Sequence, residues 1–366
     1  MKWLFRIVGG LFVLIALAVV VLSFVIGYTA PCEPIAPVAS DGSQMKSIVY
    51  RCYGSPDVLA LENIDKPTPG AGEVLVKLEA AAVNPLDWHY MRGSPYLMRL
   101  GSGIGSPKNH RLGVDFSGTV EAVGDGVTKF QVGDDVFGGR TGAFSEYVLV
   151  PEDRAIVHKP ANVSFEQAAS LPIAALTALQ ALRDKGDVQP GQKVLINGAS
   201  GGVGTFAVQI AKSMGAEVHG VCSTRNVELV LSMGADRVFN YKKEDYTESG
   251  EAYDVIVDLV GNHSLSKNRS VMTTNGRLVM VGGSSGNWFG VLKGPIAAIV
   301  SGPFVDQEMI LLLAELSEDD LMEIAELVER GDVIPVIDRR FSLEDVPAAI
   351  RYSEKGRARG KILIEF

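Results

Sequence analysis

Four glycines lie within the nine-residue segment INGASGGVG, which spans residues 196–204 and follows a short apolar run. Gly198, Gly201 and Gly204 have the spacing GxxGxxG between a predicted strand and a predicted helix. Such glycines permit a tight turn, close approach of a pyrophosphate to backbone N–H groups, and close packing of the helix. The amino-terminal end of the helix adds partial positive charge that favours phosphate. The segment therefore predicts a dinucleotide site, with contacts from Gly198, Ala199, Ser200, Gly201, Gly202, Val203 and Gly204.

The strand that follows this helix ends without a carboxylate. An acidic residue there would bond the ribose 2′-hydroxyl of NAD, whereas this chain has Ser223, Thr224 and Arg225. The hydroxyl groups can donate to a 2′-phosphate and the guanidinium can neutralise it, so we expect NADPH in preference to NADH. The alternative is that Arg225 is a solvated residue at a helix start. Tyr241, which two lysines follow, is expected on the same side of the site.

The elements around the glycine loop (residues 198–204) indicate a parallel sheet. Apolar strand segments such as KVLIN, EVHGVC, YDVIVDLV and RLVMVGG alternate with helical segments from about residue 165 onward. This alternation is typical of a doubly wound Rossmann sheet with helices on both faces. Val260, Gly282 and Gly283 end later strands, at the edge where such a sheet meets its ligand, so they are expected to contact the cofactor.

The preceding part of the chain has a different texture. Short β-rich segments, among them KSIVY, EVLVKLEAAAV, FSGTVEAVG and AFSEYVLVP, are separated by Gly, Pro and Asp turns. They predict a closed or partly closed antiparallel β unit, into which the last segment, GKILIEF, is expected to pair. The fold class is therefore α/β, with a β-rich domain, a doubly wound parallel-sheet domain and a preceding transmembrane helix.

Length and charge limit the class of protein. A chain of 366 residues suits two domains plus extras. The formal net charge of -9 argues against nucleic acid as a partner, because phosphate binding needs a basic face. The three cysteines lie far apart, with no CxxC and no Cys/His pair at metal spacing. Neither a disulfide framework nor a cysteine metal site is expected.

An uncharged segment over residues 7–26 follows Lys2 and Arg6. At about 1.5 Å per residue, a helix of this length spans roughly 30 Å, the thickness of a bilayer core. We expect an uncleaved single-pass anchor; a cleaved signal peptide and a true start at Met45 are the alternatives. The two basic residues favour a cytoplasmic amino terminus, which would place the body across the membrane from the usual NADPH pool.

The order of these motifs resembles one known family. The chain is similar to the zinc-independent medium-chain dehydrogenase/reductases, in their quinone oxidoreductase branch. The segments that carry the similarity are LPIAALTALQAL, VQPGQKVLINGASGGVGTFAVQIAK, GAEVHGVCSTRN, NPLDWHYMRG, LGVDFSGTVEAVG and ARGKILIEF. The resemblance extends over nearly all of residues 45–366 and is closest to the subgroup of the mitochondrial reticulon-interacting and chloroplast-envelope oxidoreductases. It implies a GroES-like catalytic domain, a Rossmann domain, a cleft between them and often a homodimer.

The residue patterns and the family resemblance together give a domain assignment. We expect a membrane anchor over residues 1–30, a linker over 31–45, a GroES-like catalytic domain over 46–170 completed by 306–366, and a Rossmann domain over 171–305. The apolar segment 284–304 is expected to be a lid, a bilayer contact, or ordinary core or dimer contact.

The resemblance also implies that zinc is absent. Zinc-binding members carry Cys where this chain has Asn84, and Gly-His-Glu where it has Gly-Val-Asp at 113–115. A third ligand would fall close to Ile173, which cannot bind metal. Catalytic zinc needs three protein ligands from Cys, His and carboxylate, so no metal is expected.

Without a Lewis acid, hydrogen-bond donors must polarise the acceptor. This favours hydride transfer from NADPH to a quinone or an α,β-unsaturated carbonyl compound. By the family pattern, Asn84 and Tyr96 line the cleft, with a donor near Asn84 stabilising the enolate and Tyr96 or water supplying a proton. Asp87 is a further catalytic candidate, although a structural role, in which it fixes the loop or Arg92, is favoured over acid-base chemistry. The resemblance also places Thr177 near the nicotinamide and Lys361 near the cofactor.

Two other functions stay open at this point. One is a membrane-tethered regulatory or interaction protein that binds NADPH without turnover. The other is an alcohol or aldehyde dehydrogenase, which the missing zinc ligands disfavour.

Overall fold

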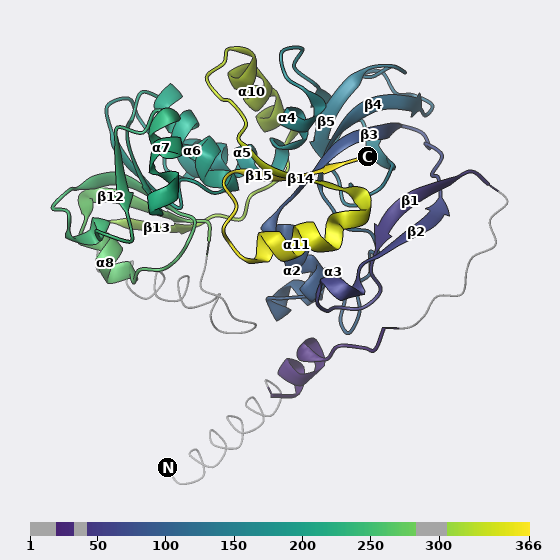
Figure 1. Cartoon of the computed structure of the whole chain (residues 1–366), viewed down its shortest axis with the longest axis horizontal. Coiled ribbons are helices and arrows are strands. Elements are labelled where there is room, and N and C mark those ends of the chain that lie inside the picture. The colour runs from purple at the N-terminus through teal and green to yellow at the C-terminus, as the bar shows by residue number, and fades with distance from the viewer. Residues whose placement is uncertain (1–19, 33–41, 283–305) are drawn as a thin grey trace, which may run out of the picture.

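The computed structural model describes residues 20–32, 42–282 and 306–366. Two domains lie side by side, and a helix near the amino terminus projects away from them (Figure 1). Each domain is built on its own sheet. The predicted α/β class, a β-rich domain beside a parallel-sheet domain, is confirmed.

The Rossmann domain contains a six-stranded sheet in the order β10-β9-β8-β11-β12-β13, with every neighbouring pair parallel. Its strand order reverses between β8 and β11, which is the point where doubly wound sheets bind their ligands. The strands are β8 (Lys193–Asn197), β9 (Glu217–Cys222), β10 (Arg237–Asn240), β11 (Tyr253–Asp258), β12 (Met272–Met280) and β13 (Glu308–Leu311). The helices are α5 (Pro172–Gln180), α6 (Gly202–Ser213), α7 (Val227–Ser232), α8 (Leu265–Arg269) and α10 (Glu318–Glu329).

This sheet extends further along the chain than the sequence indicated. Strand β13 pairs in parallel with β12, and helix α10 packs on α5. Residues 308–329 therefore belong to the Rossmann domain, although the expected boundary placed everything after 305 in the catalytic domain. The short strand EMIL carries no turn signal or alternation that separates it from the segments after it.

The catalytic domain contains a seven-stranded, largely antiparallel sheet in the order β14-β15-β3-β4-β5-β7, with β6 also paired to β3. The predicted return of the last strand is confirmed, because β15 pairs antiparallel with β3. The strands are β3 (Glu73–Val83), β4 (Asp115–Val123), β5 (Asp135–Gly139), β6 (Tyr147–Pro151), β7 (Ile156–His158), β14 (Ile337–Ser342) and β15 (Lys361–Glu365), beside a hairpin of β1 (Gln44–Val49) and β2 (Ala60–Asp65). The helices are α2 (Pro85–Arg92), α3 (Arg99–Ser102), α4 (Phe165–Ala169) and α11 (Val346–Glu354).

Helix α5 connects the two domains. Its side chains are buried almost throughout, and it packs on α6 and α10 of the Rossmann domain and on β4 and β5 of the catalytic domain. Its residues, PIAALTALQ, are mostly small or apolar, which lets neighbouring elements approach from several sides. Residues on α5 therefore lie where the two domains meet.

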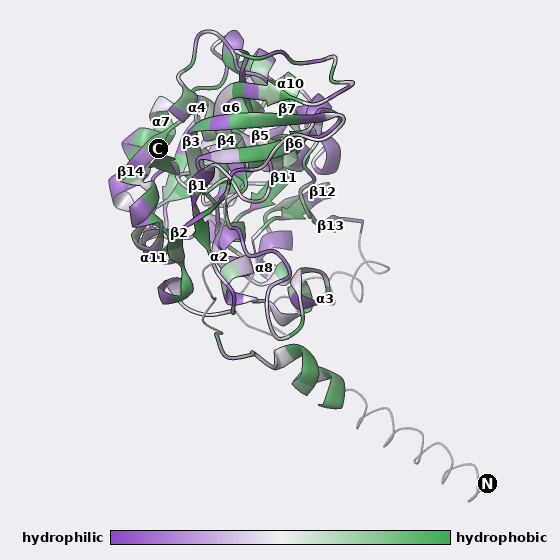
Figure 2. Cartoon of the chain, turned by 90° about the vertical axis from the view of Figure 1, so that its right-hand side faces the viewer, coloured by the Kyte–Doolittle hydropathy of each residue, from purple (hydrophilic) through white to green (hydrophobic). Residues whose placement is uncertain are grey.

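Residues 20–27 form a hydrophobic helix that projects from the catalytic domain (Figure 2). Among the described residues, no helix is both long and apolar enough to span a bilayer. Most of the predicted anchor lies outside the described residues, as do residues 33–41 of the expected linker, Gly283 and the segment 284–304.

A disulfide joins Cys32 to Cys52, with Cα atoms 5.0 Å apart. This separation lies in the usual range for a disulfide. The expectation that the cysteines stay unpaired was wrong, because their sequence spacing does not reveal that the segment after the helix returns to the catalytic domain. The segment 28–32 is thereby fixed to that domain.

Candidate active site

The glycine loop connects β8 to α6 and has no room for side chains at two of its positions. Gly198 has a φ of 96°, and its amide and that of Ala199 donate to the Val221 carbonyl at 3.2 and 3.0 Å. A Cβ on Gly204 would lie 2.2 Å from the Gly198 carbonyl oxygen, whereas a Cβ on Gly201 would meet only that oxygen, at 3.5 Å. Gly198 therefore makes the turn, Gly204 lets the helix pack closely, and Gly201 leaves open space over the loop.

The amides of the first helical turn, Gly202 to Gly204, have no acceptor within their own helix by geometry. They lie at the positive end of a twelve-residue helix. A glycine-rich loop with open space at Gly201, beside the amides of a helix start, fits the pyrophosphate of a dinucleotide. The residues present therefore fit NADPH or NADH at this loop.

The carboxyl ends of β11 and β12 lie beside the glycine loop. A Cβ on Gly198 would meet the Val260 side chain at 3.0 Å, and a Cβ on Gly282 would lie 2.1 Å from the Leu259 carbonyl oxygen. The Asp258 carboxylate holds this turn, since its Oδ1 accepts from the Val260 amide at 3.0 Å. The structure thus brings Val260 and Gly282 to the predicted edge of the sheet.

The loop after β9 lies against the glycine loop. The Asn226 side chain donates to the Ser200 hydroxyl at 2.8 Å, which joins the two loops directly. Arg225 donates to the Arg357 carbonyl at 2.5 Å, so its guanidinium reaches across to the segment before β15. The group of Ser223, Thr224 and Arg225 therefore lies next to the predicted cofactor contact Ser200.

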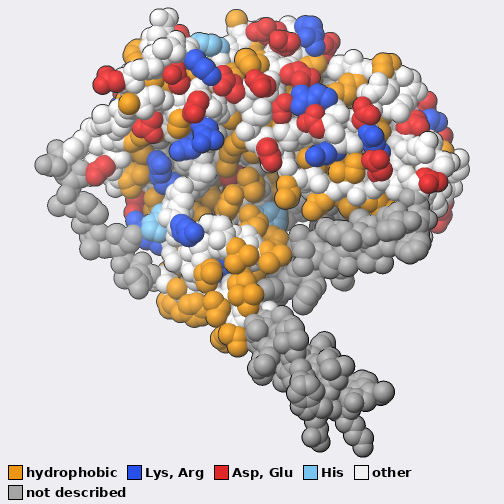
Figure 3. Space-filling view, turned by 180° about the vertical axis from the view of Figure 1, so that it is seen from behind, with side chains coloured by type: hydrophobic (Ala, Val, Ile, Leu, Met, Phe, Trp, Pro, Cys, Tyr) orange, Lys and Arg blue, Asp and Glu red, His pale blue; other side chains and the backbone are white. Residues whose placement is uncertain are grey.

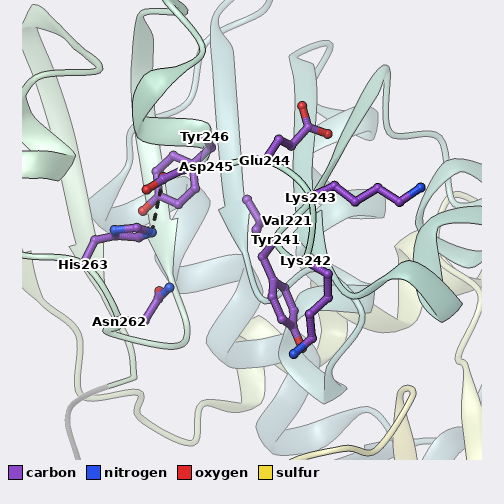
Figure 4. Close-up of a pocket in the computed structure, with 9 residues that line it drawn as sticks. All are labelled: Val221, Tyr241, Lys242, Lys243, Glu244, Asp245, Tyr246, Asn262 and His263. Atoms are coloured by element: carbon purple, nitrogen blue, oxygen red, sulfur yellow. Dashed lines mark ion pairs between the residues drawn. The ribbon is translucent and has the colours of Figure 1, made fainter.

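A pocket of about 310 Å³ lies at the ends of β9, β10 and β11 (Figure 4). Tyr241 and Lys242 point the same way from one side of it, with the Lys242 ammonium 5.1 Å from the centre of the Tyr241 ring. His263 and Asp245 pair on the opposite side, at 3.6 Å. An aromatic face with adjacent ammonium groups suits a base and a phosphate. We call this cavity the Tyr241 pocket.

A buried ammonium group lies between the two domains. The Lys361 side chain is 2% exposed, and its Nζ donates to Asn84 Oδ1 at 2.6 Å and to Asp115 Oδ2 at 3.0 Å. On the other side, a Cβ on Gly202 would meet the Lys361 Cδ at 3.3 Å. We call Lys361, Asn84 and Asp115 the Lys361 cluster; it links the glycine loop to the start of α2.

The Lys361 cluster stands where the resemblance placed a zinc site in other members. The remaining Asp115 oxygen accepts from the Ile173 amide at 3.0 Å, so the segments around positions 84, 115 and 173 do converge. The group at their centre is a cation that has no lone pair to offer a metal. Across the described ranges, no three His, Cys, Asp or Glu side chains gather as a metal-binding group. These residues do not fit catalytic zinc.

Thr177 lies on α5 close to the same cluster. Its hydroxyl donates to the Ile173 carbonyl one turn earlier, at 2.6 Å, while the Ile173 amide is held by Asp115. Thr177 and the Lys361 cluster are thus connected through Ile173 and Asp115 at the junction of the domains.

Asp87 lies in the first turn of α2 and is completely buried. Its Oδ2 accepts from the Asn84 amide at 2.7 Å, and its Oδ1 has no hydrogen-bond partner among the described residues. Burial raises the pKa of Asp87 to about 8, and the nearby Asp115 carboxylate acts in the same direction. The carboxyl group is therefore mostly protonated at neutral pH, and its Oδ1 is a buried oxygen without a hydrogen-bond partner among the described residues.

The Asp87 side chain lines a second cavity, of about 330 Å³, in the catalytic domain. We call it the Asp87 pocket. Its walls combine aromatic and apolar residues with polar and basic ones, and they include Tyr50, Tyr90, Met98, Leu112, Ser102, Lys108 and Arg111. A cavity of this size and character suits a small planar ligand.

The sequence did not indicate the tyrosines of this pocket. Tyr50 and Tyr90 line it, whereas the expected Tyr96 places its ring 4.4 Å from the Arg99 guanidinium and is not among the lining residues. Tyr90 lies three residues after Asp87 on α2, so helical periodicity was a signal for it. Tyr50 follows β1 and reaches the pocket only through the tertiary fold.

Comparison with known proteins supports the assignment of this chain to the medium-chain dehydrogenase/reductases. A family model described as an alcohol dehydrogenase GroES-like domain matches residues 70–161, and one described as a zinc-binding dehydrogenase matches residues 233–364. The chain is 33% identical to a chloroplast envelope quinone oxidoreductase homolog of Arabidopsis thaliana, covering 88% of this chain and 99% of that one. It is also 33% identical to the mitochondrial NAD(P)H oxidoreductase RTN4IP1 of Mus musculus, covering 91% and 92%.

A solved structure, the quinone oxidoreductase from Coxiella burnetii, superposes with a TM-score of 0.78 at 30% identity and covers 88% of this chain and all of its own. The expected resemblance to the reticulon-interacting and chloroplast-envelope subgroup is confirmed by the two relatives above. The chain belongs to the quinone oxidoreductase-like family of NAD(P)H oxidoreductases, within the medium-chain dehydrogenase/reductase superfamily.

Proposed function

We propose that this protein is an NADPH-dependent reductase that transfers hydride to a quinone or an α,β-unsaturated carbonyl compound without a metal ion. The observation that carries the proposal is the Lys361 cluster. It places a buried cation between the glycine loop and the turn that holds Asp87. Positive charge at this point can stabilise negative charge that develops on an acceptor oxygen.

NADPH supplies a hydride when it is bound. The amides of the glycine loop would hold the pyrophosphate of the cofactor. Val260 and Gly282 would border the cofactor where it crosses the carboxyl ends of β11 and β12. Ser223, Thr224 and Arg225 would hold the 2′-phosphate, and the lack of a carboxylate among them supports the choice of NADPH over NADH.

The Asp87 pocket holds the acceptor. As the acceptor gains hydride, its oxygen becomes negative, and the Lys361 ammonium, which Asn84 links to Asp87, would stabilise that charge from behind the pocket wall. The protonated Asp87 carboxyl then donates the proton that completes reduction. For a quinone, one hydride and one proton give the hydroquinone, and Asp87 regains its proton from water. Tyr96, the other expected proton source, lies over Arg99, so we assign the proton to Asp87.

We also propose that residues 7–26 hold the protein at a membrane, with the body on the oxidising side, where the reductase would need a source of NADPH separate from the usual pool. Two features support that side. Lys2 and Arg6 favour a cytoplasmic amino terminus, and a disulfide between Cys32 and Cys52 persists only in oxidising compartments. Protease protection of a C-terminal tag in intact cells tests the assignment; a tag shielded together with cytoplasmic markers would contradict it.

The function itself is tested with purified protein in chelator-treated buffer. We expect NADPH to be oxidised when a small soluble benzoquinone is added, and Asp87→Asn to slow turnover by about a hundredfold. Binding of NADPH without any turnover would support the binding-protein alternative. Oxidation of an alcohol by NADP⁺ that the chelator abolishes would support the dehydrogenase alternative.

A further inference from the structure

Arg99 fixes the N-terminal helix to the catalytic domain. Its side chain is 2% exposed, and its Nη1 donates to the carbonyls of Ile26, Gly27 and Tyr28 at 3.2, 3.2 and 2.7 Å. Its Nε donates to the Gly93 carbonyl at 2.7 Å. The last carbonyls of a helix have no partner of their own, and a cation is favoured beside them. Arg99 therefore caps the helix over residues 20–27 from within the catalytic domain.

Further contacts hold the same segment. The Arg99 guanidinium lies against the rings of Tyr53 and Tyr96, 4.6 and 4.4 Å from their centres. The Ala30 amide donates to the Gly105 carbonyl at 2.8 Å, and the disulfide follows two residues later. Residues 26–32 are thus attached at three places, so the helix has a fixed direction relative to the catalytic domain.

This attachment creates one apolar surface from two parts of the chain. The apolar side chains of residues 20–25 are exposed, Phe24 by 80%. Leu97, Leu100 and Ile104, on the segment that Arg99 anchors, are exposed by 41, 55 and 50%. We call these side chains together the apolar patch; Figure 3 shows hydrophobic side chains gathered at this end of the molecule. A surface of this kind marks a site of interaction.

The apolar patch lies behind one wall of the Asp87 pocket. Met98, Gly101 and Ser102 line the pocket, while their sequence neighbours Leu97 and Leu100 are exposed on the outside. The segment 97–104 therefore separates the proposed acceptor site from the patch by the thickness of a single short helix.

We infer that the apolar patch rests in a lipid bilayer, and that the Asp87 pocket takes a quinone dissolved in that bilayer, whose ring carries a long apolar chain. This inference rests on the proposed function. Residues 7–19, which directly precede the patch, carry no charge. With residues 20–26 they make an apolar segment that would span roughly 30 Å as a helix, which matches the hydrocarbon core of a bilayer.

The fixed helix sets the orientation of the catalytic domain on the bilayer. Arg99 holds the helix to the segment 97–104, and the disulfide ties the residues after the helix to Cys52 of the same domain. A membrane that receives the helix therefore also meets Leu97, Leu100 and Ile104. A quinone ring can then enter the pocket while its chain stays among the lipids, so the chain is not exposed to water.

The test uses the full chain in phosphatidylcholine vesicles with two probes. One is a benzoquinone with a decyl chain, held in the vesicles, and the other is unsubstituted benzoquinone in water. We expect the double variant Leu100→Glu/Ile104→Glu to lower the rate with the vesicle-borne quinone by about tenfold, because carboxylates resist burial in hydrocarbon. The rate with the water-soluble quinone should change by less than about twofold, since neither residue lines the pocket.

Val132→Glu is the matched control, because Val132 is 63% exposed on the turn before β5 and outside the patch. It should leave both rates unchanged. The inference is overturned if the double variant keeps the vesicle rate, or if both rates fall together, which would show damage to the site. It is also overturned if the double variant converts a dimer to a monomer, which would make a second copy the occupant. A wild-type protein inactive on the soluble quinone refutes the proposed function itself.

Discussion

The Lys361 cluster allows a sharp prediction through the variant Lys361→Met. At the 3.0 Å separation of Lys361 Nζ and Asp115 Oδ2, two unit charges attract by about 5 kcal/mol at an effective dielectric constant of about 20. Asp115 is fully buried, so removal of the ammonium leaves its carboxylate without a counter-ion. Breaking a buried pair in this way costs about 3–5 kcal/mol of unfolding free energy.

The matched control is the double variant Lys361→Met/Asp115→Asn, which removes both charges. The asparagine retains an oxygen for the Ile173 amide. We expect its free energy of unfolding to return to within about 1 kcal/mol of the wild type, because replacement of a whole buried pair is often neutral. Turnover should stay about a hundredfold low in both variants, since neither offers a cation to the acceptor oxygen.

The assay measures urea unfolding and steady-state NADPH oxidation on the wild type, on Lys361→Met and on the double variant. The reasoning is refuted if Lys361→Met is as stable as the wild type, because the pair would then not be a buried charge pair. It is also refuted if the double variant reduces quinone at the wild-type rate.

Three further predictions concern the cofactor and the proton. Gly204→Ala, whose Cβ would lie 2.2 Å from the Gly198 carbonyl oxygen, should lower both the melting temperature and the affinity for NADPH. Gly201→Ala should lower the affinity for NADPH alone. Equal melting temperatures of the two variants would contradict the packing argument. Arg225→Glu should weaken NADPH binding by about tenfold or more in fluorescence titrations while NADH binding changes little, and equal losses would refute the 2′-phosphate contact. Because burial raises the pKa of Asp87 from 3.8 to about 8, the native state binds this proton more tightly. Its contribution to stability should be lost as the pH rises through that interval, and Asp87→Asn should flatten the profile.

The glycine loop could be predicted in detail because its residue types follow from backbone geometry. The positive φ of Gly198 and the close approach at Gly204 each exclude side chains, so both positions require glycine and the sequence shows glycine at both. The parallel sheet was predictable for a similar reason, since continuous apolar strands such as KVLIN are typical of a sheet covered on both faces.

The Lys361 cluster could not be assembled from the sequence. Lys361 and Asn84 are 277 residues apart and meet only because β15 returns to pair with β3. The family resemblance placed both residues near the site, but it did not show that the ammonium stands between Asn84 and Asp115. The cap that Arg99 forms on the N-terminal helix was missed likewise, because an arginine at the start of a short helix carries no sign of partners so far away in the sequence.

Anaerobic reduction of a small soluble benzoquinone by the purified, chelator-treated protein tests the central claim most directly. The account predicts that each mole of hydroquinone formed consumes one mole of NADPH, that the rate falls about a hundredfold in Lys361→Met, and that added zinc does not raise it. A protein that binds NADPH but transfers no hydride, or one that reduces the quinone only after zinc is supplied, would contradict the account.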